Sequence, residues 1–115
     1  MKNDTQALLA ALGTGGADFA AVLAHIDAAY DFTPTAFDNG AAHNAAGQNS
    51  GSCKGLNFAQ IEGLSAAQTL QLFAEHYQAV LASPEAQDHA NIRNFMQHGW
   101  AGVRFASAAL VAKAA

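Results

Sequence analysis

Two residues of this chain, Cys53 and His43, have side chains that could carry out nucleophilic catalysis. A cysteine becomes a nucleophile when its thiol loses a proton, and a positive charge on the adjacent Lys54 favours that loss. His43 could accept the proton if the intervening glycine-rich segment folds back. The alternative is that Cys53 is a small buried residue, as most unpaired cysteines are. Whether the chain is an enzyme therefore stays open on the sequence alone.

Two polar segments offer side chains that could bind a ligand. The first covers residues 39–54 and the second residues 88–94, and both are rich in amides. Such groups beside glycine can hold an anion or a sugar, or they can form a buried hydrogen-bond network that joins one segment to the other. We expect the two segments to meet in space. The candidate ligand-binding residues are Asn39, Asn44, Asn49, Ser52, Lys54, Asp88, His89, Asn91, Arg93 and Asn94.

The five histidines show no HxH or HxxxH pair, and the single cysteine excludes a multi-cysteine zinc site and an intramolecular disulfide. We therefore expect no metal and no cofactor. A net charge of −4 with five Lys and Arg residues argues against a nucleic-acid-binding protein that neutralises phosphates. The expected partner is a protein or a small molecule, and no pattern indicates the oligomeric state.

The length of 115 residues fits one domain spanning residues 1–115, and a hydrophobic content of 51% excludes a disordered chain. No apolar run approaches the ~20 residues that a membrane-spanning helix needs. The apolar segment 7–12 is also shorter than the core of a secretory signal peptide. We therefore expect a cytoplasmic location as synthesised and no interaction with membranes.

Apolar residues at helical spacing predict two helices, over residues 4–12 and 17–30, that form a hairpin. Asp18 is favourably placed near the positive start of the second helix. Ser65 and Gln68 make a capping box, which predicts a third helix over residues 66–82. A fourth helix is predicted with Asp88 as its N-cap, a buried face of Ile92, Phe95 and Met96, and an end at Gly99.

Extended structure is predicted between these helices. Asn39-Gly40 is a strong turn signal, and the polar residues 41–52 read as a long surface loop. The Ala-rich residues 107–115 predict a frayed terminal helix. Strands or extended segments are predicted over residues 31–39, 53–61 and 100–105, from the alternation of apolar and polar residues, from β-branched residues or from a proline.

This mixture of elements predicts an α+β fold rather than a doubly wound α/β sheet. In this fold a small, mainly antiparallel sheet carries the N-terminal helical hairpin and two or three further helices. The alternative is a mostly helical domain with irregular connections.

Two stretches of the chain are similar to a known family. The first has FTPTAF at residues 32–37, NG at 39–40 and NAAGQNSGSCK at 44–54, and the second has DHANIRNFM at 88–96 followed by GWAG at 99–102. In their order and spacing these motifs resemble the HopJ type III effector family, over about residues 30–105. The chain departs from the family pattern at Gly55, where a large apolar residue is expected, and at Ala74, where glycine is expected.

The resemblance implies an effector that a plant-pathogenic bacterium delivers into host cells by type III secretion, although members also occur in bacteria that are not pathogens. It brings no biochemical activity, cofactor or catalytic residue. We therefore expect a protein that acts by binding a partner. The alternatives are a cytosolic protein that binds a small ligand with the 39–54 loop and the 88–94 helix start, and an enzyme that uses Cys53.

Overall fold

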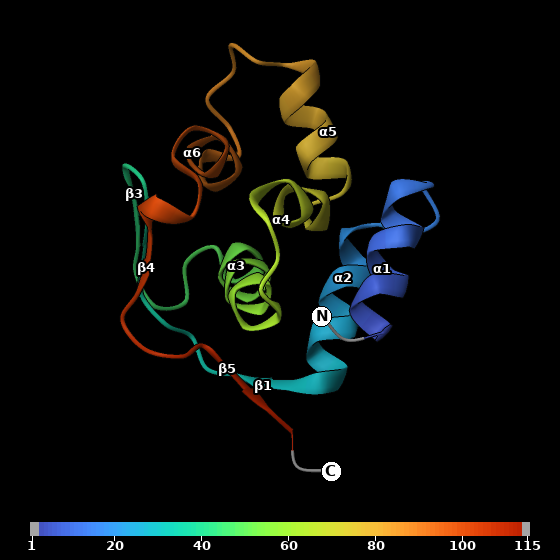
Figure 1. Cartoon of the computed structure of the whole chain (residues 1–115). Helices are drawn as coiled ribbons and strands as arrows, with labels where there is room; N and C mark the ends of the chain where they lie inside the picture. Colours follow the sequence, from blue (N-terminus) through green and yellow to red (C-terminus); the bar gives the residue numbers. More distant parts are fainter. Residues whose placement is uncertain (1–2, 114–115) are drawn as a thin grey trace.

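The computed structural model describes residues 3–113, which form an α+β fold as predicted (Figure 1). The helices are α1 (Asn3–Gly13), α2 (Phe19–Ala29), α3 (Ser50–Glu62), α4 (Ala66–Leu72), α5 (Glu75–Ala82) and α6 (Ala90–His98), followed by the 3-10 helix η1 (Gly99–Gly102). The strands are β1 (Tyr30–Phe32), β2 (Phe37–Asn39), β3 (Ala42–Asn44), β4 (Val103–Phe105) and β5 (Leu110–Ala112).

The strands make two small antiparallel sheets instead of one. In the first sheet β1 pairs with β5, so Tyr30 lies opposite Ala112. In the second sheet β2 lies between β3 and β4, and Phe37 is opposite both Asn44 and Phe105. The β2–β3 turn follows the predicted Asn39-Gly40 signal by one residue: Asn39 pairs with Ala42, so Gly40 and Ala41 form the turn, and glycine adopts the φ of 59° at Gly40 without strain.

Helix α3 lies in the middle of the molecule, with the other helices and the β2–β4 sheet around it (Figure 1). Its residues Cys53 and Leu56 belong to one hydrophobic core, and Phe58 and Ala59 belong to a second core. The prediction of a strand over residues 53–61 was wrong. A helix that is buried on all sides has no single apolar face, so the helical period is absent from its sequence.

The N-terminal helices agree with the prediction, and Asp18 is the N-cap of α2, where its side chain accepts a hydrogen bond of 2.9 Å from Ala21 N. The capping box at Ser65 is also present. The prediction of a single helix over residues 66–82 was wrong, because the chain breaks between α4 and α5 at Ala74, whose φ is 49° and ψ is −121°. At Gly55 in α3, an added Cβ would lie 3.7 Å from the Phe73 ring, which leaves room for a methyl group.

Five further details differ from the prediction. The N-cap of α6 is His89 instead of Asp88, and Met96 on α6 is 43% exposed instead of buried. The 41–52 loop is shorter than predicted, because β3 and the start of α3 occupy its two ends. Residues 99–102 form η1 before the strand begins. The predicted C-terminal helix is replaced by β5, whose pairing with β1 outweighs the helical preference of alanine, and residues 114–115 lie outside the described range.

Within residues 3–113, none of the helices has both the length and the apolar character needed to cross a membrane.

Candidate functional site

The two polar segments meet through a network of four asparagines, of which Asn39, Asn44 and Asn91 are buried and Asn49 is exposed. Asn39 Nδ2 donates to Asn91 O over 2.7 Å and to Asn91 Oδ1 over 3.1 Å. Asn44 and Asn91 exchange two side-chain hydrogen bonds, and Asn49 Nδ2 donates to Asn44 Oδ1 over 2.6 Å. Among the described residues, Asn39 Oδ1 is the buried side-chain oxygen without a hydrogen-bond partner. The network fixes the start of α6 against the β2–β3 hairpin and the start of α3, as we expected from the composition of the two segments.

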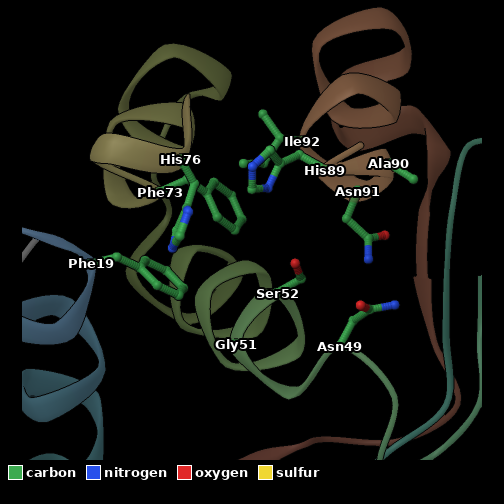
Figure 2. A pocket seen from close by; sticks show the side chains of 10 residues that line it. All are labelled: Phe19, Asn49, Gly51, Ser52, Phe73, His76, His89, Ala90, Asn91 and Ile92. Atoms are coloured by element: carbon green, nitrogen blue, oxygen red, sulfur yellow. The ribbon is translucent and has the colours of Figure 1, made fainter. Parts of the chain in front are cut away.

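Beside this network is a cavity of about 320 Å³ between the first turns of α3 and α6. Figure 2 shows these two turns facing each other, with residues of α4 and α5 and the start of α2 closing a third side. A volume of this size is at the lower end of the range for small-molecule sites. The cavity is lined by Phe19, Asn49, Gly51, Ser52, Phe73, His76, His89, Ala90, Asn91 and Ile92.

The two helix starts that line the cavity have the same unusual geometry. The N-caps Asn49 and His89 both have left-handed backbones, with φ of 51° and 52°, and neither side chain caps its helix. The first intrahelical hydrogen bonds are made by Cys53 N and Arg93 N. The backbone N–H groups of the preceding first-turn residues have no acceptor within the helix. Both positive helix ends therefore contribute donors at the cavity wall.

Two histidines reach the cavity from different elements. The rings of His76 on α5 and His89 before α6 have centroids 5.2 Å apart, and both residues are half-buried. His76 also makes an edge contact with Phe19, whose ring stacks on Phe73 with centroids 5.8 Å apart. These two phenylalanines and Ile92 give the cavity an apolar wall beside its donors. No charged carboxylate, lysine or arginine is among the lining residues.

Four of the candidate ligand-binding residues line the cavity, namely Asn49, Ser52, His89 and Asn91. Asn39 and Asn44 hold the network behind it. The other four candidates point elsewhere, and each has a structural partner. Lys54 Nζ lies 2.9 Å from Asp27 Oδ1, and Asn94 Oδ1 accepts from Ala41 N over 3.0 Å. Arg93 is turned away from both the network and the cavity, because its guanidinium donates to Ser83 O, Pro84 O, Asp88 O and Asp88 Oδ1 and closes the 83–89 loop.

Cys53 and His43 are not brought together by any contact of the described structure. Cys53 is 1% exposed, and its thiol donates to Thr35 O over 3.6 Å. Burial raises the pKa of the Cys53 thiol, and the hydrogen bond to Thr35 opposes this only in part. His43 is exposed on β3, where its Nδ1 lies 2.7 Å from Asp38 Oδ1. This environment argues against Cys53 as a nucleophile, because a reactive thiol needs access and a lowered pKa.

Phe19, Phe73 and His76 were not predicted as cavity residues. Phe19 and Phe73 fit the apolar stripes of their predicted helices, and His76 had no metal-ligand spacing to other histidines. Their place at the cavity depends on the break at Ala74, which turns α5 away from α4. The sequence signal for this break is the glycine that the family pattern has at position 74, because glycine is the residue that a positive φ favours. Within residues 3–113, no group of three or more His, Cys, Asp and Glu side chains is arranged to hold a metal ion.

Comparison with known proteins identifies relatives of the whole chain. Residues 5–110 match the family described as HopJ type III effector protein. A solved structure, the crystal structure of the protein of unknown function VPA0580, is 43% identical to this chain with a TM-score of 0.88, over 98% of this chain and 95% of the other. No curated protein matches the chain. The polar motifs that build the network and the cavity lie inside the matched range, and the chain belongs to the HopJ type III effector protein family.

Proposed function

We propose that this HopJ-family chain acts by binding a small molecule in the cavity between the first turns of α3 and α6. One observation carries the proposal: the two polar segments that resemble the family motifs converge, and the cavity forms where they meet. A buried network of this kind rigidifies the groups around it, and a preorganised site loses less entropy when a ligand binds. Membership of the HopJ family supports type III delivery as the route to the place where the chain binds its ligand.

The proposal is tested by filling the cavity with a side chain. Ser52 is half-buried in the first turn of α3, and Figure 2 shows its side chain directed into the cavity, so Ser52→Phe places a ring there. Ala79 is exposed on α5 and does not line the cavity, which makes Ala79→Phe the matched control.

The measurement is a screen of small metabolites by thermal shift, followed by 1H–15N spectra of the compounds that stabilise the protein. We expect compounds that raise the melting temperature of the wild type and of Ala79→Phe, and that fail to do so for Ser52→Phe. The expected spectral changes include the amides of Gly51 and Ser52. Compounds that stabilise Ser52→Phe as strongly as the wild type would overturn the proposal, and so would a broad screen without any stabilising compound.

A further inference from the structure

The chemistry of the cavity wall narrows the class of ligand. This inference rests on the proposed function, because it assumes that the cavity between the first turns of α3 and α6 is occupied. It goes beyond that proposal by naming the chemical groups that the ligand carries.

The first observation is the pair of histidines that meets across the cavity. His76 comes from α5 and His89 from the start of α6, and their ring centroids are 5.2 Å apart. A neutral imidazole offers one N–H donor and a protonated one offers two. Two such rings at one site can hold the oxygens of an anion and add positive charge when they are protonated.

The carboxylates near these histidines already have other partners. Asp88 Oδ2 lies 3.9 Å from His89 Nε2, but Asp88 Oδ1 accepts a hydrogen bond of 2.8 Å from Arg93. Glu75 precedes His76 on α5, and its Oε1 accepts from Phe19 N over 2.8 Å. The cavity lining itself contains no carboxylate. An anion therefore meets no unpaired negative charge in the cavity, although the whole chain has a net charge of −4.

The second observation is the set of donors opposite the histidines. Ser52 lines the cavity with its hydroxyl group, which Figure 2 shows on the side of α3 that faces the histidines. The first turns of α3 and α6 contribute backbone N–H groups beside it, and the field of both helices favours negative charge at this end. Donors from three elements are thus directed at one volume.

The third observation is the apolar wall. The stacked rings of Phe19 and Phe73 and the side chain of Ile92 cover part of the cavity with hydrocarbon. The cavity volume of about 320 Å³ corresponds to roughly ten water molecules. An inorganic anion alone would leave most of that volume, and all of the apolar wall, without contacts.

From these three observations we infer that the cavity binds a small molecule in which an oxyanion, such as a phosphate monoester, is joined to a flat apolar ring. The oxyanion lies between His76, His89 and Ser52, and the ring packs against Phe19 and Phe73. The donor set suits a phosphate or another tetrahedral oxyanion because its several oxygens accept hydrogen bonds from several directions. Aromatic side chains pack well against a flat ring in stacked or edge geometry.

The test uses phenyl phosphate and its two halves, phenol and inorganic phosphate, as probes in 1H–15N titrations of the full chain. We expect phenyl phosphate to bind at least about tenfold more tightly than phenol or inorganic phosphate. The double variant His76→Gln/His89→Gln should lose about tenfold in affinity for phenyl phosphate and little for phenol. His43→Gln, which changes an exposed histidine away from the cavity, is the matched control and should bind like the wild type.

The outcomes separate this inference from the proposed function. If phenol and phenyl phosphate bind equally well, and Ser52→Phe abolishes the binding of both, the cavity is a binding site but the assignment of an oxyanion ligand is wrong. That assignment is also wrong if neutral metabolites bind the cavity while phenyl phosphate does not. If inorganic phosphate binds as tightly as phenyl phosphate, the assignment of the apolar wall as the site for the ligand's ring is wrong. If neither these probes nor any metabolite changes the amides of Gly51 and Ser52, both proposals fail.

Discussion

Asn44 and Asn91 bind each other twice, through side-chain hydrogen bonds of 3.2 Å and 3.0 Å that run in opposite directions between β3 and α6. Each residue is at most 6% exposed, so neither amide can exchange its partner for water. Removal of one side chain leaves buried donors and acceptors of the other without partners, which costs more than the hydrogen bonds themselves contribute.

We predict that Asn91→Ala lowers the free energy of unfolding by about 1–3 kcal/mol. Urea denaturation followed by circular dichroism measures the loss. Gln97→Ala, at an exposed position of the same helix, is the control and should change stability by less than about 0.5 kcal/mol. The double variant Asn44→Ala/Asn91→Ala should cost less than the sum of the single variants, because both remove the same interaction. Fully additive losses would contradict the mutual pairing.

Ala74 joins α4 to α5 with a φ of 49° and a ψ of −121°, a conformation that glycine adopts far more readily than alanine. We predict that Ala74→Gly stabilises the protein by about 1 kcal/mol, since relief of backbone strain outweighs the greater flexibility of glycine in the unfolded chain. The same change at Ala79, inside α5 and exposed, should destabilise by about 1 kcal/mol. Thermal melts should show a higher melting temperature for Ala74→Gly and a lower one for Ala79→Gly. A lower melting temperature for Ala74→Gly would show that this backbone is not strained.

Cys53 should behave as a protected thiol. Burial raises the pKa of Cys53 above the ordinary value of 9.0, so the folded state holds the proton more tightly than the unfolded state. Its contribution to stability is therefore fully present below about pH 9 and is lost as the pH rises through the raised value. We predict that iodoacetamide labels Cys53 far more slowly in the native protein than in urea. Equal rates would restore the hypothesis of a nucleophilic cysteine.

Arg93 closes the 83–89 loop through four hydrogen bonds, one of them to the Asp88 carboxylate. The hydrogen bond from Arg93 lowers the pKa of Asp88, with a smaller contribution from His89. The stabilising effect of the Asp88 charge is thus present above the ordinary pKa of 3.8 and is lost as the pH falls through the lowered value. We predict that the Asp88 titration, followed by NMR, moves to higher pH in Arg93→Ala.

The control for this prediction is Arg104→Ala, which removes an exposed arginine on β4 and should leave the titration of Asp88 unchanged. Arg93→Ala should also lower the free energy of unfolding by about 1 kcal/mol, because the hydrogen bonds are lost but water can reach the exposed loop carbonyls that accepted them. An unchanged titration of Asp88 in Arg93→Ala would contradict the contact.

The sequence predicted those elements whose signals are local. The stripe of Val22 and Ile26 predicted α2, and Ser65 with Gln68 predicted the start of α4, because one face or one cap is enough to define them. Helix α3 could not be predicted in this way, since its five consecutive residues 55–59 are all buried and therefore define no single apolar face. The strand β5 has three residues and depends on pairing with β1, which lies about 80 positions earlier.

The site could be predicted only in part, because the composition of a segment is visible in the sequence and its tertiary contacts are not. The amide-rich composition of residues 39–54 and 88–94 indicated that the segments meet, and Asn44, Asn49 and Asn91 join them. The apolar wall and His76 depend on how α5 turns at Ala74, which is a property of the tertiary structure. Lys54 and Arg93 pair away from the cavity, because charge alone does not show which nearby carboxylate or carbonyl a long side chain will reach.

Because α3 belongs to both cores, no partial opening frees its middle turns while the remainder of the molecule stays intact. The amides from Leu56 to Ala59 should therefore exchange with deuterium only through complete unfolding. A molecule held at the first turn of this helix would slow that exchange, because its binding stabilises the folded state against complete unfolding. The occupancy of the cavity could then be measured from the exchange rates of amides that the bound molecule does not contact.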